Sequence, residues 1–177
     1  MVVRGIGVVS PVGIGADASW DALVAGRSGV ADITLFDTTD YPIHVAGEVK
    51  GFDATEYMDG KDVRRHDRNT HFAVAAAGEA LRGAGLLNAD GMLDAGQADR
   101  DRFGMIVGTA IGGIGIIADG LATLRDRGPG PAPPFPLPHM RPHRAARHWA
   151  SQAAHPAPNP PAARAARPRR PPPRAPR

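Results

Sequence analysis

Apolar residues form short runs, separated by glycine and proline, along the first 130 residues of the chain. The run VVRGIGVVS at residues 2–10 is rich in β-branched residues and ends at a Ser-Pro pair, which predicts a buried strand followed by a turn. RFGMIVGTA at residues 102–110 has the same character and predicts a second buried strand. In IHVAGEVKGF at residues 43–52, apolar and polar positions alternate, which predicts a strand or hairpin arm.

Three other segments carry the spacing of helices. In ADASWDALVAG, residues 16–26, the larger apolar residues recur at helical spacing, and the final glycine is placed to end the helix. Residues 62–86 have the strongest helical pattern, and a glycine-rich turn leads into a further helix within residues 111–128. The helix at 62–86 has a narrow stripe suited to close packing on a sheet or helix, made by Phe72, Ala76, Ala80 and Ala84. Strands alternating with helices predict an α/β fold with a mixed or parallel sheet.

The composition changes abruptly at residue 131. Residues 1–130 hold all 18 acidic residues and 12 of the 21 basic ones, a net charge of −6. Residues 131–177 hold nine arginines, no lysine, no acidic residue and 15 of the 18 prolines, a net charge of +9. Proline removes backbone donors, the arginines repel one another, and few large apolar groups remain. We therefore predict a folded body at 1–130 and a disordered Pro/Arg/Ala-rich tail at 131–177.

The origin of the tail is a separate question. A linker normally holds Ser, Gly, Glu, Gln or Lys, whereas this tail is dominated by residues whose codons are richest in G and C. We interpret residues 131–177 as out-of-frame translation of a GC-rich gene, with a genuine proline-arginine interaction tail as the alternative. The arginines could also bind nucleic acid, but residues 161–177 have no aromatic side chain to stack on bases. Nucleic acid is therefore the least favoured partner.

Several classes of protein are excluded by what the chain lacks. It has no cysteine, hence no disulfide, no thiolate metal site and no cysteine nucleophile. Its start does not read as a signal peptide, and no apolar run approaches the roughly 18 residues of a membrane span. We therefore expect a cytoplasmic protein that does not insert into membranes. Four histidines of the tail lack a rigid scaffold for ligand geometry, so neither a metal nor a cofactor is expected: His139, His143, His148 and His155.

Five motifs follow one another along the body. They are GIGVVSPVGIG at 5–15, SWDALVAGRSGV at 19–30, FDTTDYPIHVAGEVKGF at 36–52, VRRHD at 63–67 before a helix, and GTAIGGIG at 108–115. Their order and spacing resemble the first third of a β-ketoacyl-acyl-carrier-protein synthase of the type II class, a condensing enzyme. The resemblance covers about residues 2–130. It implies a partial thiolase-like fold, namely the N-terminal part of its first half.

The resemblance also implies a chemistry. Enzymes of this family transfer an acyl group from acyl-carrier protein to an active-site cysteine and condense it with malonyl-carrier protein, releasing carbon dioxide. They use a cysteine at a helix N-terminus, two histidines and an oxyanion hole, all beyond the region that this chain matches. The body's histidines, His44, His66 and His71, lie where the family has no catalytic histidine. Ser10 lacks the G-x-S-x-G elbow of a nucleophile and is expected to be a turn residue.

Two sets of residues can be carried over from the family. Lys61, Arg64 and Arg65 match basic positions with which related synthases meet the acidic carrier protein, and their spacing predicts one shared helix face. The alternative is a solvated helix end paired with Asp62 and Asp67. Ile111 of GTAIGG matches the isoleucine that borders the acyl channel, and the alternative is a turn packed for steric reasons. A dinucleotide-type loop is disfavoured because the GTAIGG segment breaks the G-x-G-x-x-G pattern.

Two hypotheses for function follow. The first is the N-terminal portion of a 3-oxoacyl-[acyl-carrier-protein] synthase of fatty-acid or polyketide biosynthesis, inactive alone because it lacks the nucleophile. The second is a non-catalytic protein that docks acyl-carrier protein or dimerises with a complete synthase. The resemblance implies a homodimer for the parent enzyme.

Overall fold

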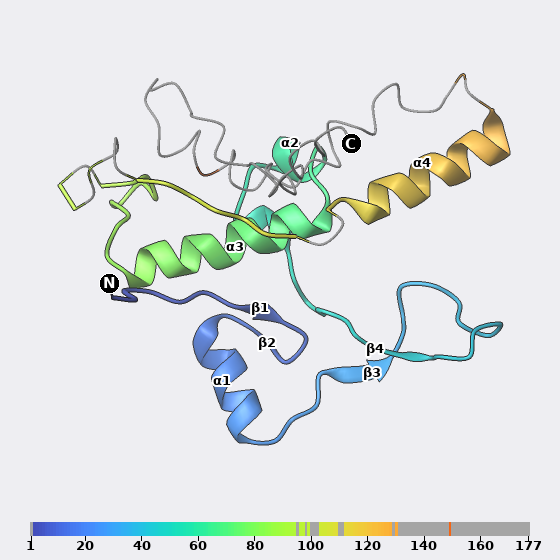
Figure 1. The fold of residues 1–177 in the computed structure, drawn as a ribbon, viewed down its shortest axis with the longest axis horizontal. Helices are drawn as coiled ribbons and strands as arrows, with labels where there is room; N and C mark the ends of the chain where they lie inside the picture. Colours follow the sequence, from blue (N-terminus) through green and yellow to red (C-terminus); the bar gives the residue numbers. More distant parts are fainter. Residues whose placement is uncertain are drawn as a thin grey trace, which may run out of the picture.

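The computed structural model describes residues 2–94, 96–97, 99, 103–109, 112–128, 130 and 149. The longest helix, α3 (Arg68–Gly83), lies at the centre, with the N-terminal elements along one side and α4 extending beyond its N-terminal end (Figure 1). The other elements, in chain order, are β1 (Val9–Ser10), β2 (Gly13–Ile14), α1 (Ala16–Val24), β3 (Val30–Asp32), β4 (Val45–Gly47), the 3-10 helix η1 (Ala54–Glu56), α2 (Gly60–Val63) and α4 (Ile114–Arg127).

The strands form two small antiparallel ladders. β1 pairs with β2 through Val9 and Ile14, and β3 pairs with β4 through Ala31 and Ala46. The alternating pattern around β4 thus forms a hairpin arm, as predicted. Helices and strands give the α/β character expected, but no parallel pair of strands occurs among the described residues. Within that part of the chain, the expected mixed or parallel sheet is not formed.

The two segments predicted as buried strands are extended but largely exposed. Of residues 2–10, only Val9–Ser10 belongs to a ladder, and Val2 and Val3 are each 82% exposed. Residues 103–107 alternate between partly buried and exposed positions, as a strand does, and Ile106 is 92% exposed. The prediction of burial is therefore wrong. Within the described part of the chain, only the short β1–β2 ladder pairs with these segments, so most of their length has no neighbouring strand to cover it.

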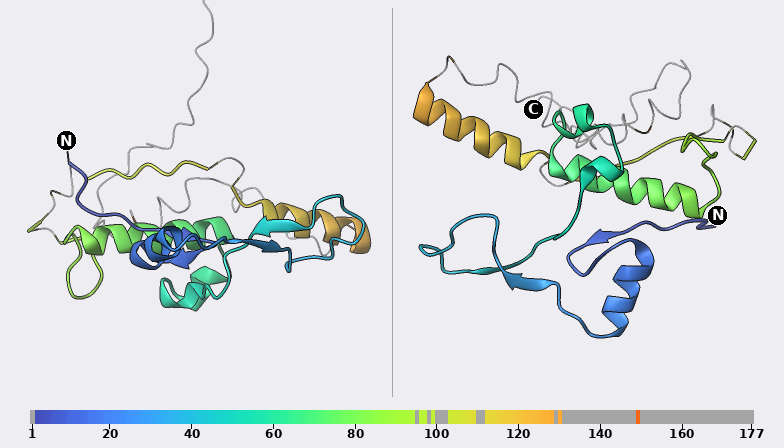
Figure 2. Two further views of the ribbon diagram at one scale, coloured as in Figure 1. Left: turned by 90° about the horizontal axis from the view of Figure 1, so that it is seen from below. Right: turned by 180° about the vertical axis from the view of Figure 1, so that it is seen from behind.

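The stripe of small residues on α3 packs closely, as predicted. The N-terminal segment lies directly on it (Figure 2). A Cβ built on Gly5 would overlap the carbonyl oxygen of Ala80, and one built on Gly7 would overlap that of Ala76. These contacts require glycine in the segment, because any side chain there would collide with the helix backbone.

The single helix predicted over residues 62–86 is divided into α2 and α3. Asp67 causes the break, since it has extended backbone angles (φ −84°, ψ 163°) and its carboxylate accepts a hydrogen bond from the Arg68 N–H at 2.7 Å. An aspartate in this N-cap position stabilises the start of a helix. At the other end, Gly85 (φ 67°) follows the last turn, where glycine is favoured.

The buried core lies on the side of α3 that faces α2. It consists of Met58, Val74 and Trp149, surrounded by partly buried apolar residues: Val63, Ala77, Leu81, Leu87 and Met105. Trp149 is the only residue beyond 130 that the structure describes, and it is 7% exposed. At this position the chain is held against α3, whereas the remainder of the predicted tail lies outside the described residues.

The large apolar side chains of α1 face outward. Trp20, Leu23 and Val24 are 66%, 59% and 70% exposed, whereas Ser19 and Ala22 are buried. Gly26 (φ 67°) follows the helix end, as predicted. None of the helices in the described segments is both long and apolar enough to cross a membrane.

Candidate functional site

Three basic side chains predicted to form a docking surface lie together on and just after α2. Lys61, Arg64 and Arg65 are all exposed. Hydrogen bonds from the Arg64 N–H to the Gly60 carbonyl (3.3 Å) and from the Arg65 N–H to the Asp62 carbonyl (3.0 Å) extend the helical turn through both arginines. We call Lys61, Arg64 and Arg65 the basic cluster. The short α2 is therefore sufficient to present all three side chains to solvent.

The neighbouring carboxylates do not neutralise the whole basic cluster. Among the described residues, no ion pair joins Lys61 or Arg64 to Asp62 or Asp67. The Asp67 carboxylate instead caps α3. It also lies close to Gly115 at the start of α4, since a Cβ added to this glycine would be 3.3 Å from the carboxylate oxygen. Two charges of the cluster are thus available to an external anion.

Arg68 is a further basic residue of this region that sequence reasoning missed. Its guanidinium donates a hydrogen bond to the Val49 carbonyl (2.6 Å) and lies 4.9 Å from the centre of the Phe72 ring. Phe72 in turn packs edge-on against Phe52 at 5.0 Å. A guanidinium over an aromatic face is held by a cation–π interaction. Its spacing of four residues from Arg64 is the signal that could have indicated a wider basic surface.

The histidines of the body make structural contacts. Nε2 of His71 lies 3.1 Å from the Val63 carbonyl oxygen, and Nδ1 of His66 lies 2.7 Å from that of Asp62. Burial lowers the pKa of His71 below its ordinary value, although the hydrogen bond to Val63 opposes this. His44 contacts the Thr38 hydroxyl at 3.2 Å on the exposed β3–β4 hairpin. Each ring therefore has a local partner.

Ser10 is the last residue of β1 and borders the two-residue turn to β2, beside the position that was predicted for it. Its hydroxyl donates to the Gly13 carbonyl at 3.1 Å and lies 3.1 Å from the Ser19 hydroxyl. These bonds close the β1–β2 turn onto α1. Among the described residues, no histidine or carboxylate is hydrogen-bonded to the Ser10 hydroxyl.

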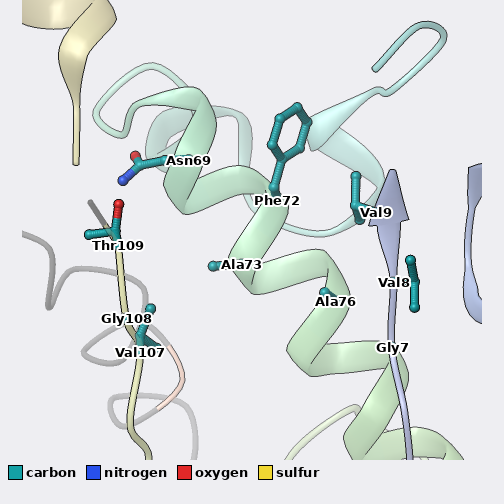
Figure 3. Close-up of a pocket in the computed structure, with 10 residues that line it drawn as sticks. All are labelled: Gly7, Val8, Val9, Asn69, Phe72, Ala73, Ala76, Val107, Gly108 and Thr109. Carbon is teal, nitrogen blue, oxygen red and sulfur yellow. The ribbon is translucent and has the colours of Figure 1, made fainter. Parts of the chain in front are cut away.

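A groove of about 470 Å³ crosses α3 (Figure 3). Its walls are the extended segments 7–9 and 107–109, and its floor is one face of α3, made by Asn69, Phe72, Ala73 and Ala76. We call it the α3 groove. None of the described residues that line it is ionisable, and the Thr109 hydroxyl accepts a hydrogen bond from the Gly112 N–H at 3.2 Å. The described lining of the α3 groove therefore supplies no side chain that could act as an acid or base near neutral pH.

Two sequence predictions fall on residues that the structure does not describe. Ile111, expected to border an acyl channel, lies outside the described residues, as do the four histidines of the tail. Beside Ile111, the described Gly112 is buried and has a positive φ of 83°, which favours glycine in this turn. Within the described residues, no group of three His, Asp or Glu side chains could hold a metal ion.

Comparison with known proteins identifies the family. Residues 1–148 match the family described as "Beta-ketoacyl synthase, N-terminal domain". The chain is 38% identical over 140 residues to 3-oxoacyl-[acyl-carrier-protein] synthase 2 of Synechocystis sp., a match that covers 79% of this chain and 32% of that protein. The chain thus spans about a third of the length of this relative.

Solved structures show the same fold. The ishigamide ketosynthase/chain length factor superposes with a TM-score of 0.68 at 29% identity, covering 85% of this chain and 36% of that one. A type II polyketide ketosynthase, solved in complex with its acyl-carrier protein, has a TM-score of 0.64 at 22% identity, covering 87% and 40%. The described elements therefore follow the ketosynthase fold in part, and the chain belongs to the beta-ketoacyl synthase family, of which it matches the N-terminal domain.

Proposed function

We propose that this chain is the N-terminal portion of a 3-oxoacyl-[acyl-carrier-protein] synthase whose complete form carries out decarboxylative condensation with malonyl-carrier protein. The observation that carries the proposal is the 38% identity over 140 residues to a synthase of this type, of which the chain spans only a third. The family match ends at residue 148, and neither it nor the rest of the chain supplies a cysteine. The chain alone is therefore proposed to be inactive.

The physical reason is the absence of a thiolate. The first step of the proposed parent reaction moves an acyl group from one sulfur to another, which needs a nucleophile that is strong at neutral pH. The hydroxyl of Ser10 is hydrogen-bonded to the Gly13 carbonyl at the β1–β2 turn, and no base among the described residues is hydrogen-bonded to it. Incubation of the purified chain with acyl- and malonyl-carrier protein should leave its intact mass unchanged, whereas the Synechocystis synthase should acquire the acyl group. A covalent acyl adduct on this chain would refute the proposed inactivity.

We also propose that the basic cluster of Lys61, Arg64 and Arg65 docks acyl-carrier protein. The support is its exposure and the lack of acidic partners for Lys61 and Arg64 among the described residues. An acidic carrier protein would be attracted to such a cluster, and the attraction would weaken with salt. Ile111 is proposed to border the acyl channel of the complete enzyme, on the basis of its position in the GTAIGG motif alone.

The second candidate function is a non-catalytic protein that docks carrier protein or pairs with a complete synthase. It is favoured by one specific observation: the basic cluster is presented on a folded turn of a chain that has no catalytic cysteine. A condensation assay and a carrier-binding assay on the same preparation separate the two functions. Binding without condensation is expected under both, and addition of this chain to a complete synthase should change that enzyme's rate only under the second.

The out-of-frame origin of the tail also stands as a proposal. The match to the family ends at residue 148, which lies beyond the change of composition at residue 131. Family-like sequence thus continues for some distance after the prolines begin. The change of composition is the observation that supports a frame change, so we place the proposed frame change at residue 131.

A further inference from the structure

The loop that joins β3 to β4 carries large apolar side chains that are mostly exposed. Four of them have between 56% and 70% of their surface exposed: Leu35, Phe36, Tyr41 and Ile43. The rings of Phe36 and Tyr41 meet edge to face, with their centres 5.8 Å apart. The loop extends away from β1, β2 and α1 (Figure 1). We call residues 35–43 the hairpin tip, and its grouped aromatic and aliphatic side chains are typical of an interaction surface.

Hydrogen bonds fix the backbone on which these side chains stand. The Glu48 carboxylate accepts from the N–H groups of Thr34 (3.0 Å) and Leu35 (3.1 Å) and from the Thr34 hydroxyl (2.7 Å). The Asp37 carboxylate accepts from the N–H (3.0 Å) and the hydroxyl (2.6 Å) of Thr39. The hairpin tip is therefore ordered before a partner arrives, which lowers the conformational entropy lost on binding.

The charge of the hairpin favours a basic partner. Residues 31–48 contain no lysine or arginine and four acidic residues: Asp32, Asp37, Asp40 and Glu48. Among the described residues, no ion pair joins these carboxylates to a basic side chain. Carboxylates bind arginine, and aromatic rings bind both the guanidinium group and the prolines of an extended segment. A segment rich in arginine and proline would therefore complement the hairpin tip.

The chain has such a segment at its own end. Residues 164–177, RAARPRRPPPRAPR, consist of six arginines, five prolines and three alanines. The contact of Trp149 with α3, made by its indole N–H and the Val74 carbonyl at 3.1 Å, fixes the point from which this end departs. At the roughly 3.1 Å per residue of a polyproline helix, residues 150–163 would span about 40 Å. The 16 residues of α3 are only about 24 Å long, so the chain's end is long enough to reach past α3.

We propose that the hairpin tip binds residues 164–177 of the same chain, with arginines on Asp37 and Asp40 and prolines on Phe36 and Tyr41. The support is the match in charge and side-chain chemistry, together with the length of chain that follows Trp149. The inference is independent of the proposed condensation reaction and of how the tail arose, so its failure would leave both of those proposals unchanged.

Helix α1 is the alternative surface. Trp20 and Leu23 are exposed there, and Asp17 and Asp21 lie on the same helix. It offers a single aromatic ring, however, and Arg27 follows shortly after the helix. The hairpin tip, with two aromatic rings and no basic residue, is the better match for an arginine-rich segment.

Paramagnetic relaxation in the full chain tests the proposal. Because the chain has no cysteine, Ala175→Cys gives a single site for a nitroxide label and keeps every arginine. At low salt, we expect the amide signals of Phe36 and Tyr41 to lose at least half of their intensity relative to the reduced label. Signals of α1 should lose less than half as much. Added salt should restore the signals of the hairpin tip, because it screens exposed charges.

Two matched double variants locate the contact. Tyr41→Ala/Asp40→Asn removes one aromatic ring and one charge from the hairpin tip, and Trp20→Ala/Asp21→Asn removes the same kinds of group from α1. All four residues are exposed. We expect the hairpin variant to reduce the signal loss at Phe36 at least twofold and the α1 variant to leave it unchanged.

A third variant changes only the proposed ligand segment. Arg169→Gln/Arg170→Gln/Arg174→Gln should also reduce the signal loss at Phe36 at least twofold, and it decides the matter if the hairpin variant disturbs the β3–β4 ladder. Equal signal losses at α1 and the hairpin tip, or a loss that the arginine substitutions leave unchanged, would overturn the proposal. So would a loss of the same size when the nitroxide and the observed amides are on different copies, since the occupant would then be the tail of a second copy.

Discussion

The Glu79 carboxylate of α3 accepts a hydrogen bond from the backbone N–H of Ala16, the first residue of α1, at 2.6 Å. Its other oxygen accepts one from the Val8 N–H at 2.8 Å. Gly15, which precedes α1, supplies no side-chain cap, so a carboxylate 63 residues away along the chain performs that role. One acidic side chain thus joins the N-terminal segment, α1 and α3, and its charge favours the N-terminus of α1.

Replacing Glu79 with alanine should therefore destabilise the whole N-terminal unit. Two partly buried N–H groups would lose their acceptor, which costs about 1–3 kcal/mol for each group left unsatisfied. We expect a lower midpoint in urea unfolding of the full chain and faster hydrogen exchange at Val8 and Ala16. Glu56→Ala is the control, because the side chain of this exposed glutamate makes no hydrogen bond to any other described residue. Equal effects of the two substitutions would show that Glu79 does not hold these elements together.

The case of Glu79 shows what the sequence could and could not predict. Local patterns located α1, α3, α4 and the hairpin arm, because helical spacing, capping residues and alternation act over a few neighbouring residues. The contact of Gly7 with Ala76 was half predicted, since the stripe on α3 indicated close packing but not which segment would fill it. Glu79 looked like a solvent-facing helix residue, and nothing in its local sequence indicated two acceptor roles at distances of 63 and 71 residues.

Burial was the property that local patterns predicted least well. Ile106 and Val3 lie in segments with the composition of interior strands, yet both are exposed, because burial depends on partners from distant parts of a fold. The basic cluster was predicted by its spacing, although the break at Asp67 shortened the helix that presents it. The α3 groove could not be predicted, since it lies between segments about 100 residues apart in the sequence.

Reversing charge in the basic cluster should weaken binding of acyl-carrier protein. Arg64→Glu/Arg65→Glu changes the local charge by four units, and we expect at least a tenfold rise in Kd at low salt, with a flatter dependence on salt concentration. Titration calorimetry or fluorescence anisotropy with labelled carrier protein measures both quantities.

The matched control for this charge reversal is Arg125→Glu/Arg127→Glu at the end of α4. It changes the net charge equally at exposed positions away from the cluster. If both double variants weaken binding to the same degree, the carrier protein responds to overall charge. The proposal that acyl-carrier protein docks on Lys61, Arg64 and Arg65 would then be wrong.

Stability should fall in mildly acidic solution because of His71. Burial is the largest cause that lowers its folded pKa below 6.5, and neighbouring His66 and Arg68 lower it further, whereas Asp67 raises it. As the pH falls below 6.5, His71 therefore takes up a proton more readily in the unfolded chain than in the folded one. The free energy of unfolding is greatest above pH 6.5 and decreases as the pH falls towards the folded pKa of His71. His71→Gln keeps a donor for the Val63 carbonyl and should reduce the slope of unfolding free energy between pH 5 and 7. His44→Gln, which replaces an exposed histidine, is the matched control. An unchanged slope in His71→Gln would exclude this origin.

The proposed frame change predicts a specific nucleotide sequence. Reading the gene with a shift of one or two nucleotides near codon 130 should give a continuation that contains a cysteine and resembles the synthase. Sequencing of the locus, with translation in all three frames from codon 125 onward, is the measurement. If no frame yields such a continuation, the Pro/Arg/Ala-rich residues are a genuine part of the protein and need a function of their own.

Trp149 and Gly78 form the contact that ties the chain beyond residue 130 to α3. The indole N–H of Trp149 donates to the Val74 carbonyl at 3.1 Å, and a Cβ on Gly78 would stand 2.9 Å from the ring. Trp20, the other tryptophan, is 66% exposed. Trp20→Phe should therefore leave a blue-shifted fluorescence that iodide quenches poorly, and Trp149→Phe should leave a red-shifted fluorescence that iodide quenches well.

A double-mutant cycle separates the contact from the effect of glycine itself. Alanine is favoured over glycine inside a helix by about 1 kcal/mol, so Gly78→Ala should stabilise the chain where Trp149 has been replaced by alanine. With Trp149 present, the same substitution forces the indole ring away from α3. It should then lower the free energy of unfolding of the chain, typically by about 1–3 kcal/mol for an overpacked site. The sign of the Gly78→Ala effect should thus reverse between the two backgrounds, as measured by urea unfolding. A stabilising effect of the same size in both would show that the indole ring does not lie on Gly78.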